Sequence, residues 1–307
     1  MRNLITITAT FFITMHSTNL ISAQEAAIKS DEMIVFLENR DSIANYGCAV
    51  FVESDTDANK IDLASFQQDW HLHCFHGPSR KRRIDTISLS DLKLSSGAVK
   101  ELPNDLITFF SETETVQYYG NRRQTIDIAK ATDVDKASML KQVYFDPVTV
   151  SCVGQSAMKP RDVYSDPGDI YRRIVDRYKM TNVELNGMVT EVEYRVSDKF
   201  PIFDVIFFDR RQGEMPVVVN RERRDSGNRE STKIENSSTN WISKNDRWYP
   251  HEATLKLDYG NGTKSWKLKY YWWVENVSDL IFDTAEKKTI YSNDLKEMIV
   301  AECFNRR

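Results

Sequence analysis

The chain has 307 residues, of which 41% are hydrophobic and 28% are charged. This composition is typical of a globular protein and argues against a disordered chain or a bundle of membrane helices. The formal net charge of −4 gives no electrostatic indication of nucleic-acid binding, and the 11% aromatic content favours strands.

The first 23 residues have the pattern of a secretory signal peptide. Arg2 precedes an apolar run from Leu4 to Met15, and a polar segment then ends at Ala23, where we expect cleavage, with Ala26 or Ala27 as alternatives. The apolar run is too short to span a bilayer, and no later stretch approaches the necessary length. We therefore expect a periplasmic or secreted protein without a transmembrane segment, although a buried N-terminal strand is the alternative interpretation.

The next residues predict one helix followed by strands. Apolar residues at helical spacing predict a helix over Gln24–Ala44, and alternating side chains predict a strand over Tyr46–Glu53. Residues Trp70–Leu89 read as a hairpin folded over Gly77-Pro78-Ser79. Three further strands are predicted within Leu106–Ile128.

The second half predicts a helix and then more hairpins. A helix is expected from Asp166 to about Tyr178. The strands that follow are expected at 188–196, 201–209, 216–223, 233–242, 248–259 and 264–274. Of these, the strand at 201–209 is apolar on both faces and should be central, and Asn261-Gly262 joins the last two. We expect one α+β domain over residues 24–307, with a curved antiparallel sheet packed on the N-terminal and middle helices and a partly helical tail at 278–307.

The four cysteines leave three possible disulfide pairings in an oxidising compartment. Cys48 and Cys74 are predicted in neighbouring strands, each on the more apolar face, so they are the best placed pair. The alternative is that the cysteines are small buried hydrophobic residues.

The predicted hairpin also holds candidate reactive groups. His71 and His73 emerge from one face of a strand, a spacing that can place two imidazoles on one Zn²⁺, with His251 or a carboxylate as the third ligand. The alternative is a pair of exposed or half-buried strand histidines. The run Arg80-Lys81-Arg82-Arg83 predicts a solvated edge, with a processing site or a patch for anionic surfaces as alternatives.

A broad apolar surface is the feature that points to function. It is made by residues on one face of three predicted strands: Trp266, Leu268, Tyr270 and Trp272; Leu255, Leu257 and Tyr259; and Val192 and Tyr194. Such a surface can accept an acyl chain or a hydrophobic peptide. The alternative is that the two helices cover it as ordinary core.

The order of elements resembles the periplasmic outer-membrane lipoprotein carrier and lipoprotein-sorting superfamily. The matching features are the helix after the signal peptide, the strand at Tyr46, Arg82-Arg83-Ile84-Asp85, Thr113–Tyr119, Phe145-Asp146-Pro147, Gly187–Tyr194, Phe208–Pro216, Trp241 and Asn245–Pro250. The resemblance implies an unclosed half-barrel around helices, with an apolar cavity that shields lipid chains. It assigns no functional residue individually.

The expected function is therefore that of an exported, non-catalytic protein that binds a lipid or lipoprotein acyl chain on the apolar concave face, without a cofactor. An envelope protein is a further expected partner. Two alternatives stay open: a metal-dependent hydrolase that uses His71 and His73, and an interaction module that adds a partner's strand to a sheet edge.

Overall fold

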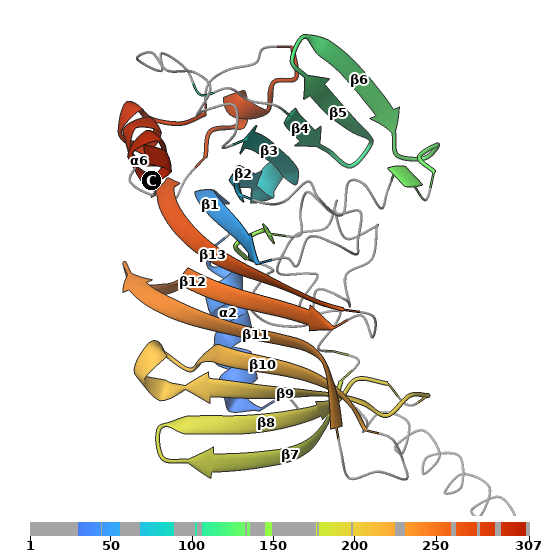
Figure 1. Ribbon diagram of the computed structural model, residues 1–307, viewed down its shortest axis with the longest axis vertical. Coiled ribbons are helices and arrows are strands. Elements are labelled where there is room, and N and C mark those ends of the chain that lie inside the picture. Colours follow the sequence, from blue (N-terminus) through green and yellow to red (C-terminus); the bar gives the residue numbers. More distant parts are fainter. Residues whose placement is uncertain are drawn as a thin grey trace, which may run out of the picture.

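One large antiparallel sheet dominates the computed structural model of this chain (Figure 1). The structure describes residues 30–43, 45–55, 68–88, 102, 106–132, 134–135, 145–148, 176, 178–197, 199–224, 231–258, 262–274, 277–285 and 290–304. The predicted signal peptide lies outside these residues, as does the predicted middle helix apart from residues 176 and 178, which are not helical.

The described elements are two α-helices, three 3-10 helices and thirteen strands. The α-helices are α2 (Asp31–Asp41) and α6 (Asn293–Phe304), and the 3-10 helices are η1 (Gly77–Ser79), η5 (Arg210–Gln212) and η6 (Asp279–Phe282). The first six strands are β1 (Asn45–Asp55), β2 (Gln68–His76), β3 (Lys81–Ser88), β4 (Leu106–Phe110), β5 (Glu114–Tyr119) and β6 (Arg122–Asp127). The other seven are β7 (Lys179–Asn186), β8 (Val189–Arg195), β9 (Ile202–Asp209), β10 (Met215–Arg224), β11 (Ser231–Lys244), β12 (Arg247–Asp258) and β13 (Thr263–Val274).

The sheet is assembled from two meanders that meet at its middle. Its strand order is β6-β5-β4-β3-β2-β1-β13-β12-β11-β10-β9-β8-β7. The chain runs from β1 outward to β6, resumes at β7 at the far end, and returns to β13, which pairs with β1. Figure 1 shows this junction, where blue β1 lies beside orange β13. The predicted antiparallel, unclosed sheet is confirmed.

Tight turns with left-handed residues set the hairpin registers. Asn245 and Asp246, with φ of 52° and 58°, form the two-residue connection between β11 and β12, a pattern that matches the twist of paired strands. Gly213, with φ of 64°, ends η5 before β10. The predicted hairpin over Gly77-Pro78-Ser79 is also confirmed, with Arg80 left-handed at φ 50°.

The two described α-helices cover opposite faces of the sheet. Helix α2 buries Met33, Phe36 and Leu37 in one core cluster with residues of β8–β11, and we call the face that it covers the inner face. Helix α6 buries Leu295 and Ile299 against the outer face of β1 and β2. The predicted N-terminal helix is confirmed over Asp31–Asp41, but Ser30, which the prediction placed inside it, is its extended N-cap and accepts a hydrogen bond from the Met33 amide at 3.3 Å.

Strand β7 was not predicted. It is the last strand at its end of the described sheet, and all its described side chains except one are exposed, so the apolar alternation that marks a half-buried strand is weak. One consequence is that β9, expected to be central, lies third from this end.

No helix in the described part of the chain combines the length and the apolar character needed to cross a bilayer.

Candidate functional site

The centre of the inner face is apolar across three adjacent strands. The register places Val50 of β1 opposite Tyr270 of β13, and Val52 opposite Leu268. On the other side of β13, Trp266 faces Leu255 of β12. These side chains belong to one buried core cluster, so the predicted aromatic surface exists and is continuous across the junction of the two meanders.

The predicted ligand-binding residues divide into three groups. Leu255, Leu257, Trp266, Leu268 and Tyr270 are buried together on the inner face. Trp272 is half-buried beside them, and its indole Nε1 donates to the Pro250 carbonyl at 2.9 Å. Val192 and Tyr194 are on the same face but lie in β8, in the cluster that includes residues of α2; Tyr259 is not among the described residues.

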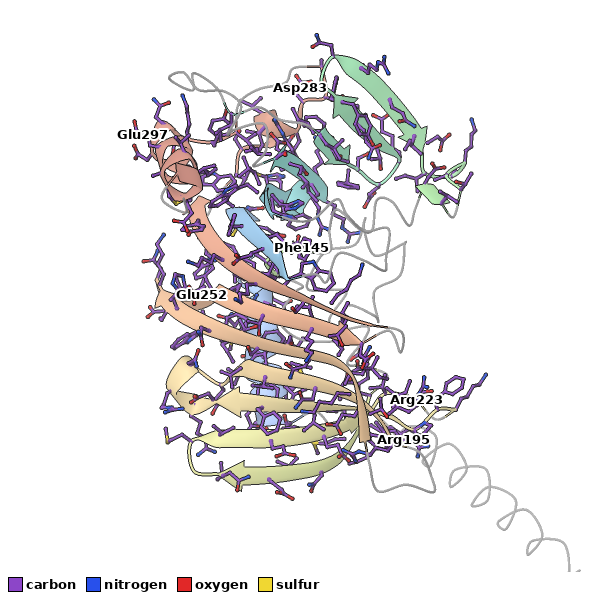
Figure 2. All side chains as sticks on the ribbon, in the orientation of Figure 1. Phe145, Arg195, Arg223, Glu252, Asp283 and Glu297 are labelled. Carbon is purple, nitrogen blue, oxygen red and sulfur yellow. The ribbon has the colours of Figure 1, made fainter. Side chains whose placement is uncertain are left out.

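Phe145 and Val148 cover this apolar surface from outside the sheet. Both side chains are buried and join its cluster. The Phe145 ring meets Trp266 edge-on, with centroids 6.1 Å apart, and its centroid is 5.6 Å from that of His71. Figure 2 shows Phe145 beside β1 and β13. A short loop segment, rather than a described helix, therefore contacts the middle of the face.

Asp146 ties this segment to the sheet. Its Oδ2 accepts a hydrogen bond of 2.6 Å from the Tyr46 hydroxyl and lies 3.6 Å from Nη2 of Arg82, while its Oδ1 accepts from the Val148 amide at 2.9 Å. Burial and the nearby carboxylate raise the pKa of Tyr46 well above its ordinary value, so the phenol keeps its proton and acts as the donor.

His71 and His73 lie on the inner face and are fully buried, with 1% and 0% exposure. The alternative interpretation, in which these are exposed or half-buried strand histidines, is therefore wrong. Burial lowers the pKa of each to about 3, assisted by the mutual proximity of the rings for His71 and by the Arg82 charge for His73. Both imidazoles are neutral at physiological pH.

The zinc alternative finds no third ligand in the described residues. Among them, no group of three His, Cys, Asp or Glu side chains is arranged to hold a metal ion. His251 is exposed on β12 and does not join the two buried imidazoles.

The solvated edge predicted for the basic run is wrong for Arg82 and Arg83, because β3 lies inside the sheet and not at its edge, although Arg80 is exposed. Arg82 and Arg83 are buried, at 2% and 0% exposure, on opposite faces. Arg83 donates to both carboxylate oxygens of Asp85 at 2.8 Å. Because residues two apart on a strand share a face, the Arg83-x-Asp85 spacing could have predicted this pair, whereas the contact of Arg82 with Asp146 depends on a distant loop.

The predicted disulfide is also wrong, since Cys48 and Cys74 are free, buried thiols. Cys48 is opposite His73 and Gly47 is opposite Cys74, so the two cysteines point to opposite faces of the sheet. The alternative, in which they act as small buried hydrophobic residues, is confirmed for this pair. Cys152 is not among the described residues.

Comparison with known proteins gives matches of fold only. No protein-family model matches the chain, and no curated protein matches its sequence. The solved structures that resemble it include LolA-superfamily and lipoprotein-sorting proteins. A LolA superfamily protein from Nitrosomonas europaea is 10% identical with a TM-score of 0.44, over 81% of this chain and 96% of that one.

Two further solved structures match with similar sequence identities and TM-scores. A putative outer membrane lipoprotein-sorting protein domain from Vibrio parahaemolyticus is 12% identical with a TM-score of 0.40, over 82% of this chain and 96% of that one. A DUF1329 family protein from Desulfovibrio piger is 8% identical with a TM-score of 0.39, over 83% and 99%.

A second polar set lies on the inner face, in the other meander. Arg221 of β10 donates to both oxygens of Asp204 in β9, at 2.7 and 2.8 Å, and to the Tyr178 hydroxyl at 2.8 Å. Burial lowers the pKa of Arg221, but the charge and hydrogen bonds of Asp204, together with Tyr178 and Glu235, raise it overall. The apolar centre is thus flanked by one buried arginine on each side.

Proposed function

We propose that this chain is an exported, non-catalytic binding protein that holds a lipid or lipoprotein acyl chain against the inner face of its sheet. The observation that carries the proposal is the apolar surface formed by β1, β13 and β12, whose centre is contacted by Phe145 from a loop segment. A loop side chain can be replaced by a ligand without breaking a strand pairing.

The energetics favour an apolar chain over a polar substrate. Each methylene removed from water contributes about 0.8 kcal/mol, and the apolar centre offers no directional contact that would select one chain length. Binding should therefore be loose in its selectivity. On the inner face, Asp146 and Asp204 are engaged in ion pairs, and His71 and His73 are held neutral. This arrangement suits retention of a ligand better than general acid-base catalysis.

Native mass spectrometry of the full chain, exported and purified without detergent, should show added mass that is released by organic solvent as lipid. A clean unliganded mass, together with failure to bind a fluorescent acyl probe, would contradict the proposal.

A matched pair of variants locates the binding surface. Phe145→Ala should increase affinity for the acyl probe, because the probe no longer competes with the phenyl ring for Trp266. Phe207→Ala is the control. Phe207 is a half-buried residue of β9, and it lies on the outer face because its neighbours Ile206 and Phe208 are buried in the cluster on the inner face. Equal effects of the two substitutions would place the probe elsewhere.

A further inference from the structure

Arg82 differs from the other buried arginines of the β-strands in the hydrogen bonding of its guanidinium. Arg83 and Arg221 each donate two hydrogen bonds to a carboxylate and one more to a neighbouring oxygen. Arg82 is equally buried, but within the described part of the chain none of its three guanidinium nitrogens makes a hydrogen bond. Its carboxylate partner, Asp146, is 3.6 Å away, which is an ion pair without a hydrogen bond.

Two more polar side chains without hydrogen bonds flank Arg82 on the same face. His73 is opposite Ile84 in β2, and Thr108 is opposite Ile84 in β4, so each is a diagonal neighbour of Arg82. Both are fully buried, and neither the His73 ring nitrogens nor the Thr108 hydroxyl has a hydrogen-bond partner among the described residues. We call Arg82, His73 and Thr108 the donor set.

The donor set adjoins the apolar surface. His73 pairs across the strands with Cys48, and Cys48 pairs on its other side with Trp272 of β13. A ligand whose chain lies along β13 would therefore bring its polar end to β2 and β3. A buried donor without a hydrogen-bond partner destabilises the folded state. A ligand that supplies acceptor oxygens here removes that cost in free energy.

The charge balance decides which acceptor fits. Asp146 already neutralises Arg82, and His73 is neutral because burial lowers its pKa to about 3. An oxyanion would leave a net negative charge in a dry interior, which is strongly unfavourable. A neutral carbonyl oxygen accepts from the guanidinium and the imidazole without adding charge.

We infer that the donor set binds the neutral carbonyl oxygens at the head of an acylated ligand, either the esters of a glycerolipid or the amide of an N-acylated polypeptide. This inference rests on the proposed function and adds to it a defined position for the polar end of the ligand. It predicts that carbonyl groups, and not chain length alone, determine affinity.

The test compares two lipids that differ only in their carbonyls. Dioleoylglycerol and its dioleyl ether analogue have equal chains, and each would be titrated against the full chain by displacement of the acyl probe. The ester should bind about tenfold more tightly, the scale of one hydrogen bond to a charged donor. Equal affinities would rule out a glycerolipid ester as the source of the carbonyl and leave the proposed function standing, whereas binding of neither lipid, and of no acyl probe, would remove both the inference and the proposed function.

An N-acylated peptide of the same chain length forms the third arm. If the peptide binds tightly and the ester does not bind more tightly than the ether, an amide supplies the carbonyl. Reduction of that amide to an amine should then weaken binding of the peptide. If amide reduction also has no effect, the inference fails.

Matched variants test the donors themselves. Thr108→Val should reduce the preference for the carbonyl ligand, while Thr239→Val, the same substitution at a buried inner-face hydroxyl on β11, should not. His73→Leu removes a buried polar group and should fold normally, yet it too should reduce the preference. Arg82→Met is made together with Asp146→Asn to keep the site neutral, and a retained tenfold preference in that folded double variant would contradict the inference.

Discussion

The Tyr46 hydroxyl and the Asp146 carboxylate, one hundred positions apart in the sequence, form a buried hydrogen bond of 2.6 Å. Tyr46 lies near the start of β1, which pairs with β13 at the junction of the two meanders, and Asp146 belongs to the segment that carries Phe145 onto the inner face. This bond and the Arg82 ion pair are therefore polar contacts that help to hold the segment in place.

The first prediction follows from that hydrogen bond. Tyr46→Phe leaves the buried carboxylate with one fewer donor and should lower the free energy of unfolding by about 1–3 kcal/mol, as measured by urea denaturation. Tyr119→Phe, at an exposed position, is the control and should change stability by less than about 0.5 kcal/mol. Equal stability of the Tyr46 variant and the native protein would show that the contact contributes nothing.

The second prediction concerns the cysteines. Burial raises the pKa of Cys48 and of Cys74, and the thiolate is the reactive form. Iodoacetamide should therefore modify neither residue in the folded protein, and both in urea without any reductant. Recovery of a peptide that joins Cys48 to Cys74 from oxidised, folded protein would contradict the opposite-face register.

The third prediction compares two glycines that share a left-handed backbone. At Gly213, an added Cβ would lie 2.0 Å from Nε1 of Trp248, whereas at Gly187 nothing lies within 4 Å. Gly187→Ala should cost about 1 kcal/mol of stability from backbone strain alone, and Gly213→Ala should cost about 1–3 kcal/mol more because the indole must move. Thermal unfolding of the two variants measures the difference, and similar melting temperatures would show that Trp248 yields without cost.

Most strands could be predicted from the sequence because their signals are local. Alternation identified β1 and the long strands β11 to β13, and strand-forming residues on both sides of Gly77-Pro78 identified the hairpin of β2 and β3. Strand β12 shows the alternation plainly, because its side chains alternate between buried and exposed positions. Strand β7 escaped prediction for the opposite reason: Val183 and Leu185 remain exposed at the end of the described sheet, so burial imposes no pattern on its sequence.

The site could be predicted only in part. The apolar face depends on alternation within β12 and β13, and the sequence shows it. The roles of Arg82 and Asp146 depend on the register of β2 against β3 and on a loop that returns to the sheet, and neither is recorded in local spacing. The cysteine pairing failed for the same reason, because a register offset of one residue exchanges the faces of a strand.

The last prediction concerns pH and the two buried histidines. In the unfolded chain each imidazole has a pKa of about 6.5, while in the folded protein burial lowers the pKa of His71 and His73 to about 3. Between these values the unfolded state binds more protons, so the free energy of unfolding falls as the pH falls through this window. From pH 7 to pH 5 the loss should be about 2 kcal/mol for each histidine. Urea denaturation at both pH values measures it, and His73→Leu should remove about half of the loss. His251→Leu, at an exposed position, should remove none, and an undiminished loss in the His73 variant would show that other groups control the acid sensitivity.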